Sequence, residues 1–126
     1  MNVPDDLRYT SDHEWVRLVQ GKACLGLTDY ATEALGEIVF VRLPVVGVVV
    51  TAGASFSEVE STKSVSDVYA PLSGTVVEVN AALADAPEQL NEDPYGKGWL
   101  CVIEPIDSSA YEHLLDADAY RKLIET

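Results

Sequence analysis

Few residues in this chain have the types and spacing needed for chemistry, and one lysine, Lys63, stands out among them. It lies in the stretch 56–71, where small and β-branched residues predict two short strands that meet at a tip near Thr62 and Lys63. A lysine at such a tip would present its amine to solvent, where a modifying enzyme could acylate it. A lone lysine on a surface strand also protects a sheet edge against unwanted pairing, so this stretch alone leaves both interpretations open.

The other three lysines occupy ordinary positions. Lys22 follows a turn glycine, Lys97 lies between two turn glycines, and Lys122 lies in a terminal helical segment. Lys63 differs because neither glycine nor asparagine occupies its tip, although tight hairpins usually need one of them. Something other than turn propensity therefore places a lysine at this position.

The sequence contains no recognisable catalytic constellation. No serine lies in a Gly-x-Ser-x-Gly motif, and no glycine-rich loop has the spacing that binds phosphates. Glu58 and Glu60 would share one face of a strand, which is more typical of a solvated surface than of an acid–base pair. We therefore expect a protein that is not itself an enzyme.

Histidines and cysteines do not suggest a metal centre. His13 and His113 are far apart and have no partners at ligand spacing. Cys24 and Cys101 lie in separate apolar runs and form no Cys-x-x-Cys motif, so we expect buried thiols that pack as small apolar side chains.

Composition restricts the class of partner. The chain has 126 residues and a formal net charge of −13, and we expect a single domain over residues 1–126. An acidic surface disfavours nucleic acids and anionic membranes, because both need lysine and arginine for binding. The charge suits transient encounters with more basic proteins, although it can also serve solubility alone.

The sequence carries no segment that predicts membrane insertion or export. Its longest apolar stretch, residues 43–50, is too short to span a bilayer and contains Pro44 and Gly47. Residues 1–6 are acidic and lack the apolar run of a secretory signal or the arginines of a transit peptide. We therefore expect a cytoplasmic protein, or a mitochondrial matrix protein if a transit peptide has been removed.

The first half of the chain has clear signals of local structure. Residues 15–19 and 23–27 flank a glycine and predict a β-hairpin. Thr28 is predicted to cap a helix over residues 29–35, which a glycine ends. The apolar run 38–43 is the strongest strand, and its continuous hydrophobicity predicts burial on both faces.

The second half continues with short strands and ends in helices. Ser109 and Glu112 have the spacing of a capping box, and Asp116 is placed to start a further helical piece. Other segments are a possible strand at 48–50, a strand at 75–80, a looser region at 81–91, a turn at 91–98 and a last strand at 99–104. Strands about ten residues apart predict an all-β fold with short helices: a sandwich or flattened barrel of two antiparallel sheets with a C-terminal helical tail.

Several motifs in register resemble one family, the H protein of the glycine cleavage system, a lipoyl carrier. Residues 60–74, around Lys63, look like its lipoyl-attachment motif. The other matching segments are 11–15, 26–31, 35–41, 43–44, 91–96, 98–100 and 115–120, so that the similarity runs from about residue 7 to residue 124. A set of motifs in one order is far more specific than a single Glu-Ser-x-Lys would be.

The resemblance implies a fold and a cofactor. The family has the lipoyl/biotinyl-carrier fold, with the modified lysine at a hairpin tip, which agrees with the pattern of strands. Lipoate would be bound covalently to Lys63 through an amide. Biotin carriers have methionine on both sides of the lysine, whereas Thr62 and Ser64 flank it here, which disfavours biotin.

The resemblance also implies partners. The lipoyl arm would take an aminomethyl group from a PLP-dependent glycine decarboxylase and pass it to a tetrahydrofolate-dependent aminomethyltransferase. A dihydrolipoamide dehydrogenase would then reoxidise the arm, and a lipoyl-attaching enzyme would have installed it. A carrier that relays lipoyl groups to other lipoyl proteins is an alternative role that would use the same lysine.

Three further residues are implied as a cleft for the loaded arm. Glu14 and Asp67 match acidic positions that receive its cationic end in the family, and His13 is adjacent. An exposed strand carboxylate at Glu14, a solvating charge at Asp67 and structural packing at His13 are the alternatives.

Overall fold

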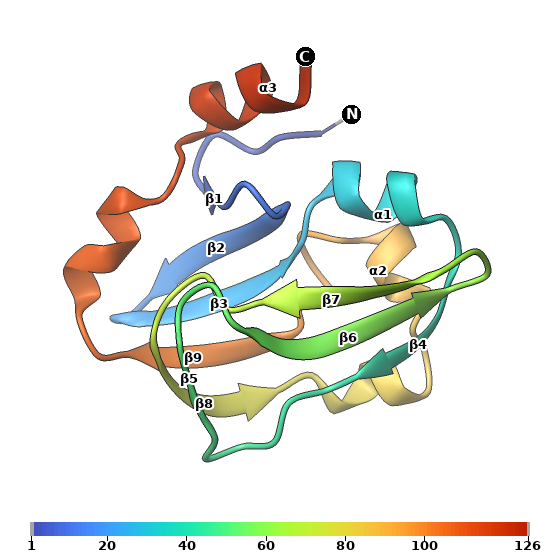
Figure 1. The fold of residues 1–126 in the computed structure, drawn as a ribbon, viewed down its shortest axis with the longest axis horizontal. Coiled ribbons are helices and arrows are strands. Elements are labelled where there is room, and N and C mark those ends of the chain that lie inside the picture. The colour runs from blue at the N-terminus through green and yellow to red at the C-terminus, as the bar shows by residue number, and fades with distance from the viewer. Residues whose placement is uncertain (1, 126) are drawn as a thin grey trace.

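Two antiparallel sheets form the body of the computed structural model, which describes residues 2–125 (Figure 1). The larger sheet has the strand order β1-β2-β3-β9-β8-β5: β1 (Arg8–Tyr9), β2 (Glu14–Val19), β3 (Lys22–Leu27), β9 (Cys101–Pro105), β8 (Gly74–Val79) and β5 (Val49–Val50). The smaller sheet has the order β4-β6-β7: β4 (Ile38–Arg42), β6 (Ser55–Ser61) and β7 (Val65–Tyr69).

Short helices connect and follow the strands. They are α1 (Asp29–Leu35), α2 (Gln89–Glu92), α3 (Ala117–Glu125) and the 3₁₀ helices η1 (Ala81–Ala84) and η2 (Ser108–His113). The prediction of a β-rich fold with two antiparallel sheets, short helices and a helical tail is confirmed, and the sheets do not close into a barrel. Across the described residues, no helix has the length and apolar character needed to cross a membrane.

The main core lies where inward-facing side chains of both sheets meet. It includes Val16, Leu25, Val59, Val68, Val76 and Ile103, all of which are buried. Burial of such aliphatic side chains contributes about 1.5–3 kcal/mol each. The core therefore fixes β6 and β7, which carry Lys63 at their shared end, against the larger sheet.

Local signals predicted the hairpin and α1 correctly. β2 and β3 pair over their whole length, from Glu14 opposite Leu27 to Val19 opposite Lys22. The Oγ1 atom of Thr28 accepts a hydrogen bond from the Ala31 amide at 3.2 Å, and this satisfies one of the free amides at the start of α1.

The prediction that residues 38–43 are buried on both faces is wrong. β4 is an edge strand, and Val39 and Phe40 are 49% and 51% exposed. The pairing of β4 with β6 shifts register between Ile38 and Phe40, which is the signature of a β-bulge. An apolar run shows that its residues are hydrophobic but not which face of the sheet each side chain is on, because a bulge places two successive side chains on the same face.

Two further predictions need correction in the second half of the chain. Ser109 does not form a capping box, because Asp107 caps η2 by accepting the Ser109 amide at 2.9 Å. The segment 91–98 is not turn throughout, since α2 extends to Glu92. Asp116 does start α3 as predicted, through a 2.8 Å hydrogen bond from the Ala119 amide.

The two ends of the chain pack together in a second core. α3 lies against the N-terminal segment (Figure 1), and the rings of Tyr9 and Tyr120 stack with centroids 4.6 Å apart. Arg121 adds hydrogen bonds to the Val3 carbonyl at 2.7 Å and to Asp5 at 2.6 Å. α3 is thus an integral part of the fold, fastened to the edge of the larger sheet.

Candidate functional site

Lys63 lies at the tip of the β6–β7 hairpin, as the sequence predicted (Figure 1). The Ser61 amide donates to the Ser64 carbonyl at 2.8 Å and closes the turn. The Ser61 hydroxyl accepts hydrogen bonds from the amides of Lys63 and Ser64, each at 3.1 Å. A serine hydroxyl therefore stabilises the turn that glycine or asparagine usually makes.

The tip is also held from the side by the segment after α1. The Thr62 amide donates to the Glu37 carbonyl at 3.0 Å. Gly36 has a φ of 87°, and a Cβ atom built there would lie 2.9 Å from Cε of Lys63. A glycine at this position thus ends α1 and leaves room for the lysine side chain to lie across the backbone.

Asn91 of α2 holds the same segment through both polar atoms of its side-chain amide. Its Oδ1 atom accepts the Ile38 amide at 2.9 Å, and its Nδ2 atom donates to the Gly36 carbonyl at 2.8 Å. Sequence reasoning missed this role, because the partners lie more than 50 residues earlier in the chain. The result is a lysine on a rigid support rather than on a loose loop.

The amine of Lys63 is available for covalent modification. The side chain is exposed, and within residues 2–125 its Nζ atom makes no hydrogen bond and no ion pair. Acylation would therefore break no stabilising interaction of this amine. This exposed lysine on a rigid tip fits the attachment of a lipoyl group through an amide.

Asp67 lies on β7, four residues beyond Lys63. Its carboxylate is exposed and accepts a hydrogen bond from the Ser55 hydroxyl at 3.1 Å. It lines a hollow of about 220 Å³ together with Arg42 and Glu58, which form an ion pair at 3.4 Å. Asp67 is thus a solvent-facing acid on the strand that leads away from the tip.

Glu14 is not an exposed strand carboxylate, because only 1% of it is exposed. Its Oε1 atom accepts the Thr10 hydroxyl at 2.6 Å, and its Oε2 atom accepts the Tyr69 amide at 3.2 Å. Burial raises the pKa of this carboxyl to about 7, although both hydrogen bonds oppose the shift. Glu14 therefore connects β2 to the open edge of β7, two residues beyond Asp67.

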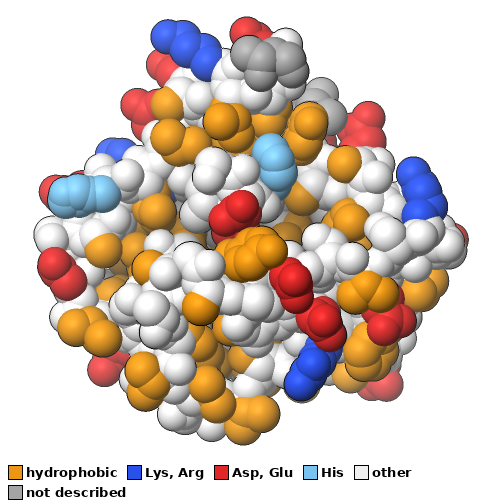
Figure 2. All heavy atoms as spheres, in the orientation of Figure 1, with side chains coloured by type: hydrophobic (Ala, Val, Ile, Leu, Met, Phe, Trp, Pro, Cys, Tyr) orange, Lys and Arg blue, Asp and Glu red, His pale blue; other side chains and the backbone are white. Residues whose placement is uncertain are grey.

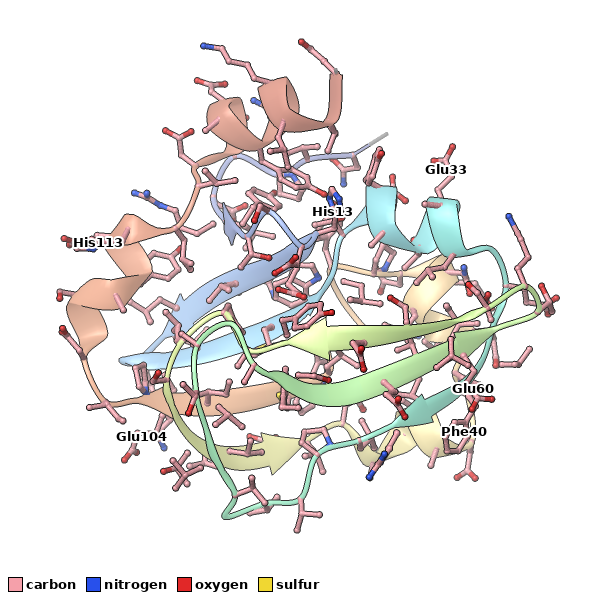
Figure 3. The ribbon with its side chains drawn as sticks, viewed as in Figure 1. His13, Glu33, Phe40, Glu60, Glu104 and His113 are labelled. Carbon is pink, nitrogen blue, oxygen red and sulfur yellow. The ribbon has the colours of Figure 1, made fainter. Side chains whose placement is uncertain are left out.

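His13 is engaged by its neighbours. Its Nδ1 atom lies 2.9 Å from the Tyr120 hydroxyl, and its ring contacts the Tyr30 ring at a centroid distance of 4.6 Å. Burial lowers the pKa of its imidazole. Figure 3 shows His13 between the start of β2 and α1, away from the hairpin tip.

The structure thus arranges the residues expected at the site along one strand. Lys63 lies in the turn two residues before β7, Asp67 is an exposed residue of β7, and Glu14 bonds to the last residue of β7. The side chain of His13, the residue before Glu14, instead contacts the Tyr120 hydroxyl of α3. In the described residues, no cluster of histidine, cysteine or acidic side chains is arranged to hold a metal ion.

The cysteines lie away from this strand. Cys101 is buried and Cys24 half-buried, and neither forms a disulfide. Burial raises the pKa of both thiols, that of Cys101 to about 12. Cys101 therefore stays protonated at neutral pH.

Comparison with known proteins agrees with this geometry. The model of the family described as glycine cleavage H-protein matches residues 7–126. A glycine cleavage system H protein of Geobacillus kaustophilus is 55% identical over 124 residues, 98% of each chain, and a probable glycine cleavage system H protein of Haloarcula marismortui has the same identity and coverage. A crystal structure of a glycine cleavage system H protein from Mycobacterium marinum is similar with a TM-score of 0.89 and 46% identity, over 98% of this chain and 100% of that one.

Proposed function

We propose that Lys63 carries the lipoyl group in this chain, which belongs to the glycine cleavage H-protein family. Members of this family are the lipoyl-carrying component of the glycine cleavage system and are not its catalysts. The observation that carries the proposal is the exposed amine of Lys63, which has no partner within residues 2–125, on a turn fixed by Ser61 and Glu37. Residues 1–126 form a single carrier domain in this proposal.

The protein's contribution is presentation. A group tethered at a fixed point visits several active sites at high effective concentration, without dissociating between steps. When bound, the lipoyl group supplies the redox and group-transfer chemistry through its dithiolane. The partners that we propose are a PLP-dependent glycine decarboxylase, a tetrahydrofolate-dependent aminomethyltransferase, dihydrolipoamide dehydrogenase and a lipoyl-attaching enzyme.

The site of attachment can be tested by mass spectrometry. Protein made without lipoate is incubated with lipoate, ATP and a lipoyl ligase, and the intact mass and the peptide that contains Lys63 are measured. We expect one lipoyl group on Lys63, none on the Lys63→Arg variant, and normal attachment to a Lys97→Arg control. Lipoate on Lys22, Lys97 or Lys122, or on no residue, would refute the assignment.

We further propose that Asp67 and Glu14 receive the cationic end of the loaded arm. Asp67 is four residues beyond Lys63, which is at most about 13 Å at the rise of an extended strand, and a lipoyl-lysine arm of about a dozen bonds reaches about 14 Å. Asp67 is exposed and unneutralised by any described basic side chain within ion-pair distance. The Glu14 carboxylate is hydrogen-bonded to Thr10 and Tyr69, so its contact with the arm requires local opening at the edge of β7. His13 has a structural role in this proposal, through its contacts with Tyr30 and Tyr120.

Hydrolytic loss of the arm's cargo measures this second role. The loaded carrier is isolated, and release of ammonia is followed in Asp67→Asn, Glu14→Gln and a Glu104→Gln control on β9. Because a carboxylate within hydrogen-bond reach stabilises a cation, we expect faster release from the first two variants and no change in the control. Equal lifetimes in all three proteins would show that neither acid protects the arm.

A further inference from the structure

A run of exposed valines lies at the edge of the larger sheet, away from the residues that the carrier role uses. We call the four of them the valine patch: Val45, Val46, Val48 and Val49, which are 69%, 54%, 44% and 68% exposed. They lie in the loop after β4 and at the start of β5, whereas Val50, the other residue of β5, is buried. Figure 2 shows hydrophobic side chains gathered at the lower end of the molecule, where Figure 1 places this loop. Contiguous exposed apolar side chains of this kind are typical of an interaction surface.

Backbone hydrogen bonds hold the valine patch in a fixed shape. The Val48 amide donates to the Val45 carbonyl at 3.2 Å and closes a turn in which Gly47 has a φ of 97°. The Gly47 amide donates to the Val76 carbonyl of β8 at 2.7 Å, and the Val76 amide donates to the Val48 carbonyl at 2.9 Å. The edge that β5 offers therefore begins at Gly47, and a partner meets it already ordered.

The β5 edge lacks the protection that the other sheet edges have. Edge strands can pair with another chain, and charged side chains, bulges or a covering segment usually prevent this. β1 is covered by the pairing of Tyr9 with Leu115, β4 has a bulge and carries Arg42, and β7 carries Asp67. β5 is the last strand of the larger sheet, and both of its residues are valines.

The distribution of charge indicates which partner fits this edge. Residues 43–57 contain no charged side chain, although the chain has a net charge of −13. Two copies that met through their acidic surfaces would bring like charges together, which opposes association. Over the valine patch they bring none together, whereas a basic partner gains no electrostatic attraction from an uncharged surface. The charge pattern therefore favours a second copy of this chain.

We propose that the valine patch is the contact surface of a homodimer, in which two β5 edges pair antiparallel about a two-fold axis. Such pairing is self-complementary, so each edge is used once and the assembly closes at two copies. The six-stranded sheets of the two copies then form one continuous sheet, and the valines of both are removed from water. In Figure 1 the patch lies at the lower left and the Lys63 tip at the right, so both tips stay accessible.

The size of the valine patch sets the strength of the dimer. A standard protein interface contains about 20–30 residues on each side, far more than this loop and strand provide. We therefore expect a weak, reversible dimer with a dissociation constant of about 0.1 mM. Because salt screens the repulsion between the acidic surfaces, this constant should fall about threefold when NaCl is raised from about 0.05 M to about 0.5 M.

Sedimentation equilibrium of unlipoylated protein from about 10 µM to about 1 mM measures the dissociation constant. Val45→Glu and Val49→Glu should each raise it at least about tenfold, because each places two like charges in the contact. Val65→Glu is the matched control, since it adds the same charge at a 59% exposed position on β7 and should leave the constant unchanged. Val45→Lys should also weaken the dimer, because an unpaired charge of either sign resists burial.

Hydrogen exchange tests the pairing without any substitution. The amides of residues 45–50 should exchange more slowly at about 1 mM protein than at about 10 µM, because pairing removes the β5 edge from water. The amides of residues 60–67, around the Lys63 turn, are the internal control and should exchange equally at both concentrations.

Three results would overturn the proposal. The first is a protein that stays monomeric throughout the concentration series. The second is a dimer that persists unchanged in Val45→Glu and Val49→Glu, because another surface then forms it. The third is a monomer whose binding to glycine decarboxylase is weakened by Val45→Glu, which would assign the patch to that enzyme. None of these results bears on lipoate attachment to Lys63, which is measured separately by mass.

Discussion

At the scale of single residues, the site contains carboxyl groups in opposite environments. Asp67 faces solvent, whereas Glu14 is buried and its carboxyl has a pKa raised to about 7 by that burial. Asp67 lies on β7 and Glu14 bonds to the last residue of β7, so the strand that follows the Lys63 turn carries one exposed carboxyl and meets one buried carboxyl that is near its midpoint at neutral pH. This difference predicts that Glu14 makes the stability of the fold depend on pH.

The sign of this effect follows from the direction of the shift. The carboxyl of Glu14 has an ordinary pKa of 4.5, the value expected when the chain is unfolded, and about 7 in the fold. Below pH 4.5 it is protonated in both states, so its contribution is fully present. Between pH 4.5 and 7 only the unfolded chain releases the proton, so the free energy of unfolding falls by up to about 3 kcal/mol from this group.

Glu14→Gln should remove this titration. In urea denaturation at several pH values, we expect the variant to gain stability relative to the unsubstituted protein as pH rises from 4.5 to 7, with Glu104→Gln as the exposed control. The comparison cancels the other carboxyl groups, which are common to both proteins. Parallel curves for the variant and the unsubstituted protein would mean that Glu14 titrates as an ordinary acid.

At the scale of elements, the sequence predicted those features whose causes are local. Thr28 and Gly36 bound α1 because a cap acts on amides and carbonyls a few residues away. The β6–β7 turn was also predicted, with Lys63 at its tip. The role of the Ser61 hydroxyl could have been inferred, since serine in a turn often bonds to backbone amides two or three residues on.

Features that depend on distant partners could not be predicted in this way. The burial of Glu14 is set by Tyr69, which is 55 residues later in the chain. The exposure of Val39 and Phe40 is set by the register of β4 against β6, and the apolar run contains no sign of the bulge. Asn91 was expected only as a turn residue, and its contacts with Gly36 and Ile38 become apparent only in the folded chain.

At the scale of the whole molecule, a chain of contacts joins the C-terminal helix to the lysine tip. The Tyr120 hydroxyl of α3 lies 2.7 Å from the Thr28 hydroxyl, which caps α1. The segment that follows α1 then meets the hairpin tip, where the Glu37 carbonyl accepts the Thr62 amide. The helical tail therefore helps, through α1, to hold the segment that contacts the Lys63 turn, although the tail itself lies far from the hairpin tip (Figure 1).

This arrangement predicts a specific role for the Tyr120 hydroxyl. The residue is fully buried, and burial raises the pKa of its hydroxyl to about 12, so that it stays protonated. Tyr120→Phe leaves the stacking with Tyr9 possible but removes the partner of both Thr28 and His13. The Thr28 hydroxyl then keeps only its bond to the Ala31 amide, and the half-buried His13 Nδ1 loses its bond to Tyr120. We therefore expect the free energy of unfolding to fall by about 1–3 kcal/mol.

Urea denaturation of Tyr120→Phe beside Tyr30→Phe measures this contribution. Tyr30 contacts the His13 ring from the other side, and its hydroxyl has no hydrogen-bond partner among the described residues, so its loss should change stability by less than about 0.5 kcal/mol. Equal effects of the two substitutions would place the stabilisation in ring packing rather than in the hydroxyl network. A larger loss for Tyr120→Phe would show that the tail holds α1 through one buried hydroxyl, and with α1 the segment that steadies Lys63.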